Sequence, residues 1–216
     1  MRLSMTEKEV MLVYRKAQRH LNRSDVVLQR VIKTVGPCTL RHNTDHFYQL
    51  VRSIVSQQIS TKAAAAIAGR LELALGKRGI TASSVRKASD DTLRAAGLST
   101  NKILALRDLA EKVASRQVRL AALHELSDEE VIESLVQIRG IGRWTAEMFL
   151  IFALGRLDVL PVGDLGLRSG VQKQYELDEA PGKIELTSLG EPWRPYRSIA
   201  TWYFWRSLSA VPQPVI

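Results

Sequence analysis

Two short stretches of this chain combine residue types that could bind a phosphate group and stabilise a reacting centre. The first is 138–146, which reads Ile-Arg-Gly-Ile-Gly-Arg-Trp-Thr-Ala, and the second is 160–164, which reads Leu-Pro-Val-Gly-Asp. Gly140 and Gly142 enclose one apolar residue between two helical patterns, and glycine adopts backbone angles that other residues resist. The first stretch therefore predicts a tight hairpin. The second ends in a single carboxylate, Asp164, directly behind a Pro/Gly loop.

The hairpin has the chemistry of a phosphate grip. A helix that starts after Gly142 leaves its first N–H groups without partners inside the helix, and these groups can donate to phosphate oxygens. Because the two glycines carry no side chains, a DNA backbone can come close, and Arg139 and Arg143 add positive charge beside it. For a bare Gly-x-Gly, an ordinary corner between two helices is the favoured interpretation, because this pattern is common.

Both sides of the hairpin have the apolar spacing of a helix. The residues before it that share one helical face are Val131, Ile132, Leu135 and Val136. The expected buried stripe after it consists of Thr145, Met148, Phe149 and Phe152. Ser127 precedes three acidic residues, which is typical of an N-cap followed by a negatively charged first turn.

Asp164 is open to more than one interpretation from the residues alone. Aspartate is favoured as an N-cap, so Asp164 could begin a helix over 165–175, or it could be one more surface acid. Capping and catalysis are compatible, because a cap residue at a helix start can still face a substrate. Asp158 lies before the Pro/Gly loop, and we expect it to be a surface acid.

The run 138–146 resembles the helix-hairpin-helix motif, and in particular the hairpin of the helix-hairpin-helix/Gly-Pro-Asp superfamily of DNA glycosylases. The likeness is greatest to alkylation-repair enzymes of the 3-methyladenine DNA glycosylase II family, and it extends from about Val26 to Leu208. It implies an all-α fold of two helical subdomains with a cleft between them. Residues 45–155 would form a central helical barrel that ends in the hairpin, and 1–44 with 156–216 would form a discontinuous second lobe.

The resemblance assigns the chemistry to Asp164, which matches the family's catalytic aspartate. Breaking an N-glycosidic bond builds positive charge on the sugar, and a preorganised carboxylate stabilises that charge. In bifunctional members a lysine after the hairpin attacks the sugar, but the matching residue here is Trp144, which cannot. The likeness therefore implies a monofunctional DNA glycosylase that flips out and hydrolytically excises alkylated purines, such as 3-methyladenine and 7-methylguanine, in base excision repair.

Two alternatives stay open. One is a bifunctional glycosylase/lyase for oxidised bases, in which Lys102 or Lys173 would supply the missing amine. The other is a non-catalytic helix-hairpin-helix module that binds DNA with strong salt dependence.

The family match also assigns a base pocket and a wedge. Trp144 and Tyr196 match aromatic residues of the pocket, with Phe47 as a weaker candidate, because electron-rich rings attract a cationic purine. Core packing is the competing role for each aromatic residue, and we expect it for Trp193, Trp202, Tyr203, Phe204 and Trp205.

Gln58, in the segment 56–60, matches the residue that enters the stack vacated by a flipped base. The alternative is that Gln57 and Gln58 cap neighbouring helix ends. The expected contacts with the DNA backbone are made by Gly140, Gly142, Arg143, Lys102 and Arg197.

We expect neither an organic cofactor nor a catalytic metal. The single Cys38 rules out an internal disulfide and the four-cysteine iron–sulfur cluster that some relatives carry. The four histidines show no metal-ligand spacing. The family's hairpin can hold a monovalent cation on main-chain carbonyls, which match Val136, Ile138 and Ile141 here.

Charge and hydropathy favour a polyanionic partner. Lys and Arg number 31 against 22 Asp and Glu, which gives a net charge of +9, and the expected partner is double-stranded DNA containing alkylated bases. We expect a monomer without membrane association, in the cytoplasm or on the nucleoid if the source is bacterial. The sequence has no apolar run of membrane-spanning length and no signal-peptide pattern.

The elements that must position these residues are helices almost throughout. Helical periodicity predicts helices at 6–21, 25–35, 45–56, 61–75, 90–96, 101–115, 127–137, 142–154, 164–175 and 193–208. Glycine and proline separate them, most clearly at Gly36-Pro37, Gly76, Gly97, the hairpin, 161–163 and Pro181-Gly182.

Overall fold

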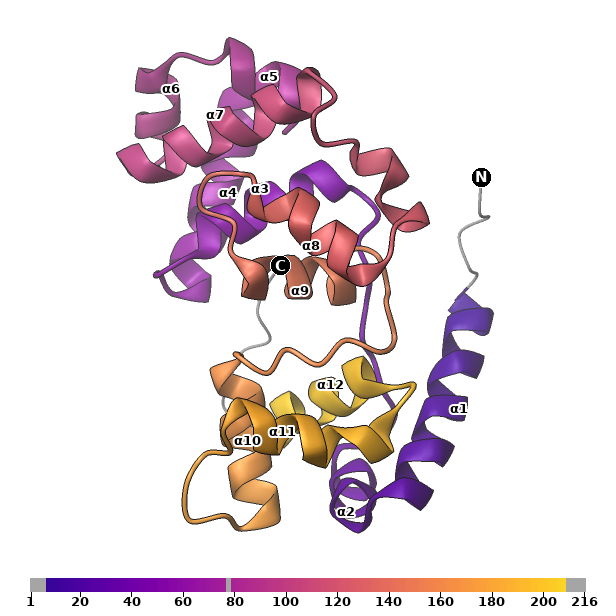
Figure 1. Ribbon diagram of the computed structural model, residues 1–216. Coiled ribbons are helices and arrows are strands. Elements are labelled where there is room, and N and C mark those ends of the chain that lie inside the picture. Colours follow the sequence, from indigo (N-terminus) through magenta and orange to yellow (C-terminus); the bar gives the residue numbers. More distant parts are fainter. Residues whose placement is uncertain (1–6, 77–78, 209–216) are drawn as a thin grey trace. The chain divides into compact units, whose positions relative to one another are not determined.

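The computed structural model describes residues 7–76 and 79–208, and these residues form helices and connecting loops without a strand (Figure 1). The all-α prediction is confirmed. None of the helices in these ranges is both long and apolar enough to cross a bilayer.

The chain divides into two compact units. One consists of residues 7–41 and 156–208, and the other of residues 42–155 apart from 77–78. The first unit is therefore discontinuous in sequence, and the second is inserted into it. Residues 1–6 and 209–216, which the predicted second lobe includes, lie outside the described residues.

The discontinuous unit consists of five α-helices and one short 3₁₀-helix. These are α1 (Glu7–Ser24), α2 (Val26–Val35), α10 (Leu165–Tyr175), α11 (Lys183–Gly190), η3 (Glu191–Trp193) and α12 (Arg197–Ser207). Helix α12 packs against α2 and α10, and α1 packs against α2. The core contains all five aromatics expected there. Trp205 is 6% exposed, and the other four are less than 2% exposed: Trp193, Trp202, Tyr203 and Phe204.

Glycine sets the spacing between α10 and α12. A Cβ on Gly170 would lie 2.8 Å from the backbone oxygen of Phe204, which is far inside normal contact distance. Only glycine lets the two helix backbones come this close. The close packing brings the end of α12 to the start of α10, where Asp164 lies.

The inserted unit contains the remaining helices, including the two between which the hairpin lies. They are α3 (His46–Ser56), α4 (Thr61–Leu75), α5 (Ala82–Lys87), α6 (Asp90–Ala95), α7 (Thr100–Ala114), η2 (Leu120–Glu125), α8 (Asp128–Val136) and α9 (Arg143–Phe152). Helix α3 contacts α4, α7 and α9, while α8 packs against α9. Every residue of α9 from Thr145 to Phe152 is buried, so this helix is the centre of the unit.

The elements differ from the sequence predictions in four places. The short helices α5 and α11 fall in segments where no helix was predicted, because six to eight residues give too little periodicity to detect. The last helix begins at Arg197, and Trp193 belongs to η3. Val136 is 42% exposed and does not share the buried face of Val131, Ile132 and Leu135.

Candidate functional site

Asp164 is a buried carboxylate at the start of α10. Its side chain is 7% exposed, and its Oδ1 accepts a hydrogen bond of 2.6 Å from the backbone N–H of Leu167. The preceding loop turns tightly, because the N–H of Asp164 donates to the carbonyl of Pro161 at 2.8 Å. Asp164 is therefore an N-cap, and it is not an exposed surface acid.

Trp205 provides a second donor to the same oxygen. Its indole Nε1 lies 2.7 Å from Asp164 Oδ1 and donates to it. The approach depends on Gly166, since a Cβ there would lie 3.1 Å from Trp205 Cδ1 and 3.2 Å from Asp164 Oδ1. Two N–H groups from different helices thus fix the orientation of the carboxylate. Trp205 is 6% exposed, as a core residue should be, but its polar contact with Asp164 was missed from sequence.

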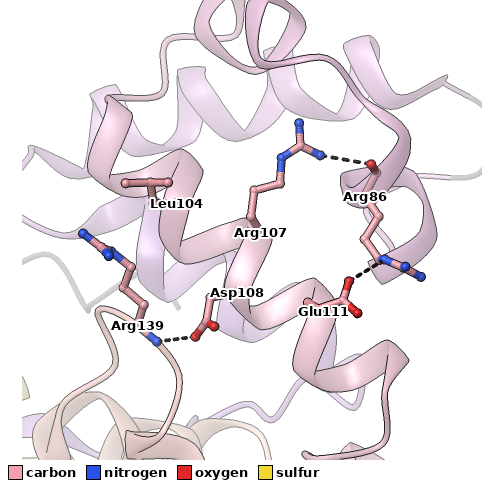
Figure 2. Close-up of a pocket in the computed structure, with 6 residues that line it drawn as sticks. All are labelled: Arg86, Leu104, Arg107, Asp108, Glu111 and Arg139. Atoms are coloured by element: carbon pink, nitrogen blue, oxygen red, sulfur yellow. Dashed lines mark hydrogen bonds and ion pairs between the residues drawn. The ribbon is translucent and has the colours of Figure 1, made fainter.

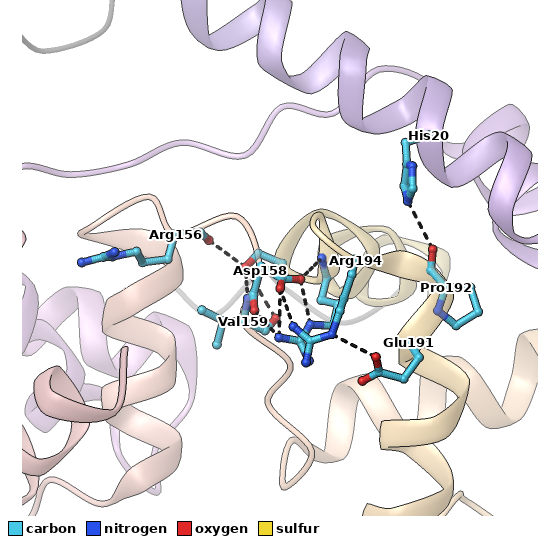
Figure 3. Close-up of polar contacts among 9 residues, drawn as sticks. His20, Arg156, Asp158, Val159, Glu191, Pro192 and Arg194 are labelled. Atoms are coloured by element: carbon cyan, nitrogen blue, oxygen red, sulfur yellow. Dashed lines mark hydrogen bonds and ion pairs between the residues drawn. The ribbon is translucent and has the colours of Figure 1, made fainter. Parts of the chain in front are cut away.

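Asp158 lies in a different environment in the same unit. Arg197 Nε donates to its Oδ1 at 2.7 Å. Arg194 Nη1 donates to its Oδ2 at 2.8 Å (Figure 3). Arg194 also pairs with Glu191 at 3.0 Å. The carboxylate of Asp158 is thus neutralised by two guanidinium groups, and it is 29% exposed. We expected an ordinary surface acid, and the structure shows an ion-pair centre that ties the start of α12 to the loop after residue 156.

Two further predicted site residues lie in this unit. The side chain of Arg197, predicted to contact the DNA backbone, is 14% exposed, and its guanidinium also donates to the backbone carbonyl of Asp158 at 2.7 Å. Tyr196, predicted to line the base pocket, is 7% exposed, and its ring packs edge-on against His20 with centroids 5.5 Å apart. Both residues have structural partners, and their roles towards DNA stay predictions.

The predicted hairpin lies in the inserted unit, between α8 and α9. Helix α8 begins with the expected Ser127 N-cap, which forms a capping box with Glu130. Gly140 has a φ of +79°, which favours glycine, whereas Gly142 has a φ of −96° that any residue adopts. The glycine-specific backbone conformation expected at both positions is therefore confirmed for Gly140 and wrong for Gly142. A Cβ on Gly142 would meet no atom within 4 Å, and Gly142, the N-cap of α9, provides no side-chain cap. Close approach of DNA at Gly142 therefore stays a prediction.

Arg143 of the hairpin forms ion pairs with acidic residues, whereas the neighbouring Trp144 is exposed. Arg143 pairs with Glu129, through hydrogen bonds of 2.5 and 3.0 Å, and with Glu147 at 3.1 Å. These hydrogen bonds, above all that to Glu129, raise the pKa of Arg143. Trp144 is 42% exposed in the first turn of α9, although most tryptophans are largely buried. An exposed aromatic face beside backbone donors can stack on a base.

The predicted wedge is a tight turn between α3 and α4. Gln58 is exposed and has a φ of +59°, which is uncommon for a residue other than glycine. Gln57 does not cap a helix end with its side chain; its Nε2 donates to the carbonyl of Gly140 in the hairpin at 2.8 Å. Ile59, which we did not single out from sequence, is 37% exposed at the same turn.

The other candidates of this unit have internal contacts. Lys102 Nζ donates to the carbonyl of Val55 at 2.6 Å, and partial burial lowers the pKa of this lysine. Phe47 is 9% exposed and belongs to the hydrophobic core of the unit. The carbonyl of Ile138, one of the three proposed for a cation, accepts from the N–H of Ile141 at 3.0 Å. No cluster of three or more His, Cys, Asp or Glu residues suited to a metal ion occurs among the described residues.

A groove of about 680 Å³ lies beside the hairpin (Figure 2). Its lining is mostly charged and consists of Arg86, Leu104, Arg107, Asp108, Glu111 and Arg139. Pockets for small organic ligands are predominantly apolar, so this groove does not have the character of a base pocket. Its importance lies in Asp108, whose Oδ2 accepts from the backbone N–H of Arg139 at 2.7 Å.

Comparison with known proteins agrees with these features. Residues 51–195 match the model of the HhH-GPD superfamily base excision DNA repair protein family. The chain is 37% identical over 214 residues to DNA-3-methyladenine glycosylase 1 of Schizosaccharomyces pombe, a match that covers 96% of this chain and 93% of that protein. A putative DNA-3-methyladenine glycosylase of Bacillus subtilis is 30% identical over 165 residues, which cover 74% of this chain and 58% of that protein.

Solved structures show the same likeness. The S. pombe 3-methyladenine DNA glycosylase in complex with abasic DNA superposes with a TM-score of 0.79 at 37% identity, covering 88% of this chain and 95% of that chain. A DNA-3-methyladenine glycosidase from Bacillus halodurans superposes with a TM-score of 0.82 at 40% identity, covering 90% of this chain and 89% of that chain. The resemblance inferred from the hairpin and Asp164 is thereby confirmed, and the chain belongs to the HhH-GPD superfamily of base excision DNA repair proteins.

Proposed function

We propose that this protein is a monofunctional DNA glycosylase that acts as a monomer on duplex DNA and hydrolytically releases alkylated purines of the 3-methyladenine and 7-methylguanine type. The observation that carries the proposal is the buried carboxylate of Asp164, held by the N–H of Leu167 and the indole of Trp205. Relatives of the same superfamily that are named 3-methyladenine glycosylases support the substrate class.

The carboxylate suits the electrostatic demand of the reaction. As the bond between C1′ and the base breaks, positive charge develops on the sugar, and a negative charge of fixed position stabilises it without reorganisation. An alkylated purine carries a positive charge and leaves readily, so a strong general acid is not needed. Asp164 can also orient the attacking water. Burial keeps bulk water from weakening these interactions.

Hydrolysis is favoured over strand cleavage by the residue after the hairpin. Trp144 occupies the position at which bifunctional relatives carry the lysine nucleophile, and its indole cannot form a Schiff base. Lys102 donates to a backbone carbonyl, and Lys173 is an exposed residue of α10. Borohydride should therefore trap no covalent protein–DNA adduct. The exposed ring of Trp144 would instead stack on a cationic base.

The test is base release from duplex DNA methylated with dimethyl sulfate, by the wild type and by Asp164→Asn. Asparagine can still cap α10 and accept from Trp205, so the variant should fold and bind DNA while losing the charge. We expect its rate constant to fall by at least about 100-fold. Asp178→Asn, at an exposed acid of the same unit, is the matched control. Equal release by Asp164→Asn and the wild type would refute the assigned role, and no release by the wild type would refute the proposed activity.

A further inference from the structure

Three side chains of the inserted unit donate to or accept from the backbone of the two elements expected to contact DNA. Gln57 Nε2 donates to the Gly140 carbonyl at 2.8 Å, which joins the wedge turn to the hairpin. Asp108 Oδ2 accepts from the Arg139 N–H at 2.7 Å, which joins the hairpin to α7 (Figure 2).

The third contact closes a ring. Lys102, also on α7, donates from Nζ to the Val55 carbonyl at 2.6 Å, near the end of α3 and two residues before Gln57. The wedge turn, the hairpin and α7 are thus linked pairwise by hydrogen bonds between residues 31 to 83 positions apart. All of these bonds lie within one compact unit.

The hydrogen-bonded ring surrounds two residues with positive φ angles, a backbone conformation that its surroundings must stabilise where the residue is not glycine. Gln58 follows Gln57 with a φ of +59°, and Gly140 has a φ of +79°. A residue other than glycine keeps such a conformation only where its surroundings fix it. The side chain of Gln57 and the anchored carbonyl of Val55 hold the turn immediately before Gln58, and they leave the side chain of Gln58 exposed.

We propose that Gln57, Lys102 and Asp108 are positioning residues that make the wedge turn and the hairpin one rigid element, so that gripping the DNA backbone drives Gln58 into the base stack. This inference rests on the function proposed above. If the wedge turn were an independent loop, it could move away from the duplex when Gln58 meets stacked bases. Because the turn is hydrogen-bonded to the phosphate-binding hairpin, it stays in place while the hairpin is bound to DNA. The ring should therefore matter most where the target base is paired and stacked.

The test compares single-turnover release of 7-methylguanine from two duplexes. In one the lesion is paired with cytosine, and in the other it lies opposite a tetrahydrofuran abasic analogue, where extrusion costs less. Gln57→Met keeps the side-chain size and removes the donor. We expect release from the paired duplex to fall about tenfold and release from the unpaired duplex to fall less than about threefold, as for loss of one hydrogen bond that acts in base extrusion.

Two further variants separate positioning from other roles. In a Gln58→Ala background, Gln57→Met should have no additional effect, because there is no wedge side chain left to position. Lys102→Met should reproduce the selective loss on the paired duplex. If Lys102 contacts phosphate instead, its loss should weaken binding to both duplexes equally and reduce the salt dependence.

The control is Gln172→Met, which removes a comparable bond of 3.1 Å to the Asp178 carbonyl in the other unit. Thermal unfolding should show that all variants are folded. An equal fall on both duplexes, or no fall with Gln57→Met, would overturn the positioning role while the glycosylase activity stands. If the wild type releases 7-methylguanine from neither duplex, both the proposed function and this inference are refuted.

Discussion

Asp158 and Asp164 are carboxylates of one compact unit, separated by a Pro/Gly loop, and their partners differ in charge. Asp158 is bound by the guanidinium groups of Arg194 and Arg197. Asp164 accepts hydrogen bonds from a backbone N–H and an indole N–H. Both carboxylates are fixed in orientation. The guanidinium groups beside Asp158 offset its charge, whereas the N–H groups of Leu167 and Trp205 that donate to Asp164 are neutral. Neutral donors hold a carboxylate in place while preserving the negative charge that a developing cation needs, and this difference separates the candidate catalytic acid from the structural one.

After Asp164→Asn, the substitution with the largest expected effect on base release is Trp205→Phe. Phenylalanine keeps an aromatic ring but removes the N–H that fixes Asp164 Oδ1, so we expect base release to fall about tenfold. The measurement is the single-turnover rate on methylated duplex DNA.

Trp202→Phe is the matched control for that prediction. Trp202 lies on the same helix and is 1% exposed, and its Nε1 has no hydrogen-bond partner. Both variants should lose similar core packing, of about 1–3 kcal/mol. If Trp202→Phe lowers release as much as Trp205→Phe, packing and not the hydrogen bond explains the loss.

Gly166→Ala tests the distance between the same groups. The new methyl group would lie 3.1 Å from Trp205 Cδ1 and 3.2 Å from Asp164 Oδ1, so one of them must move by a few tenths of an ångström. We expect a fall in release of about threefold to tenfold, because small misplacements of catalytic groups are costly. Gly69→Ala, a helical position with open space around it, should leave release unchanged. Full activity of Gly166→Ala would show that the site tolerates displacement.

Asp158→Asn tests the other carboxylate. The substitution removes the negative charge that the guanidinium groups of Arg194 and Arg197 share. The free energy of unfolding should therefore fall by about 1–2 kcal/mol, between the values for exposed and buried ion pairs. Base release at a temperature where the variant is folded should stay within about twofold of the wild type. Chemical denaturation and the release assay together check this. A large loss of release without loss of stability would reverse the roles of the two acids.

Arg197→Met has the smallest expected effect on DNA. Because its guanidinium donates to Asp158, we expect the dissociation constant for duplex DNA and its dependence on salt concentration to change little, while stability falls. A phosphate contact would behave differently, since its loss reduces the salt slope by about 1. Titrations at several salt concentrations distinguish the two, and a reduced slope would restore the role predicted from sequence.

The sequence by itself determined what depends on a few neighbouring residues. The N-caps Ser127 and Asp164, the left-handed Gly140 and most helix positions follow from local hydrogen bonding and backbone preferences. The motif around these residues also identified the family, because hairpin and carboxylate recur at a characteristic spacing. Short helices such as α5 and α11 were not predicted from the sequence, because they contain too few turns to show a helical period.

Only the tertiary structure decided which distant groups meet. Trp205 lies 41 positions after Asp164, and Gln57 lies 83 positions before Gly140. Whether such pairs bond depends on how closely helices pack, as Gly170 permits between α10 and α12, and no local pattern encodes that distance. The same is true of Arg143 and Arg197: their sequence positions suggested phosphate contacts, but packing placed carboxylates beside both. Local preferences fix the backbone within a few residues, whereas the partners of a side chain are set by the packing of the whole unit.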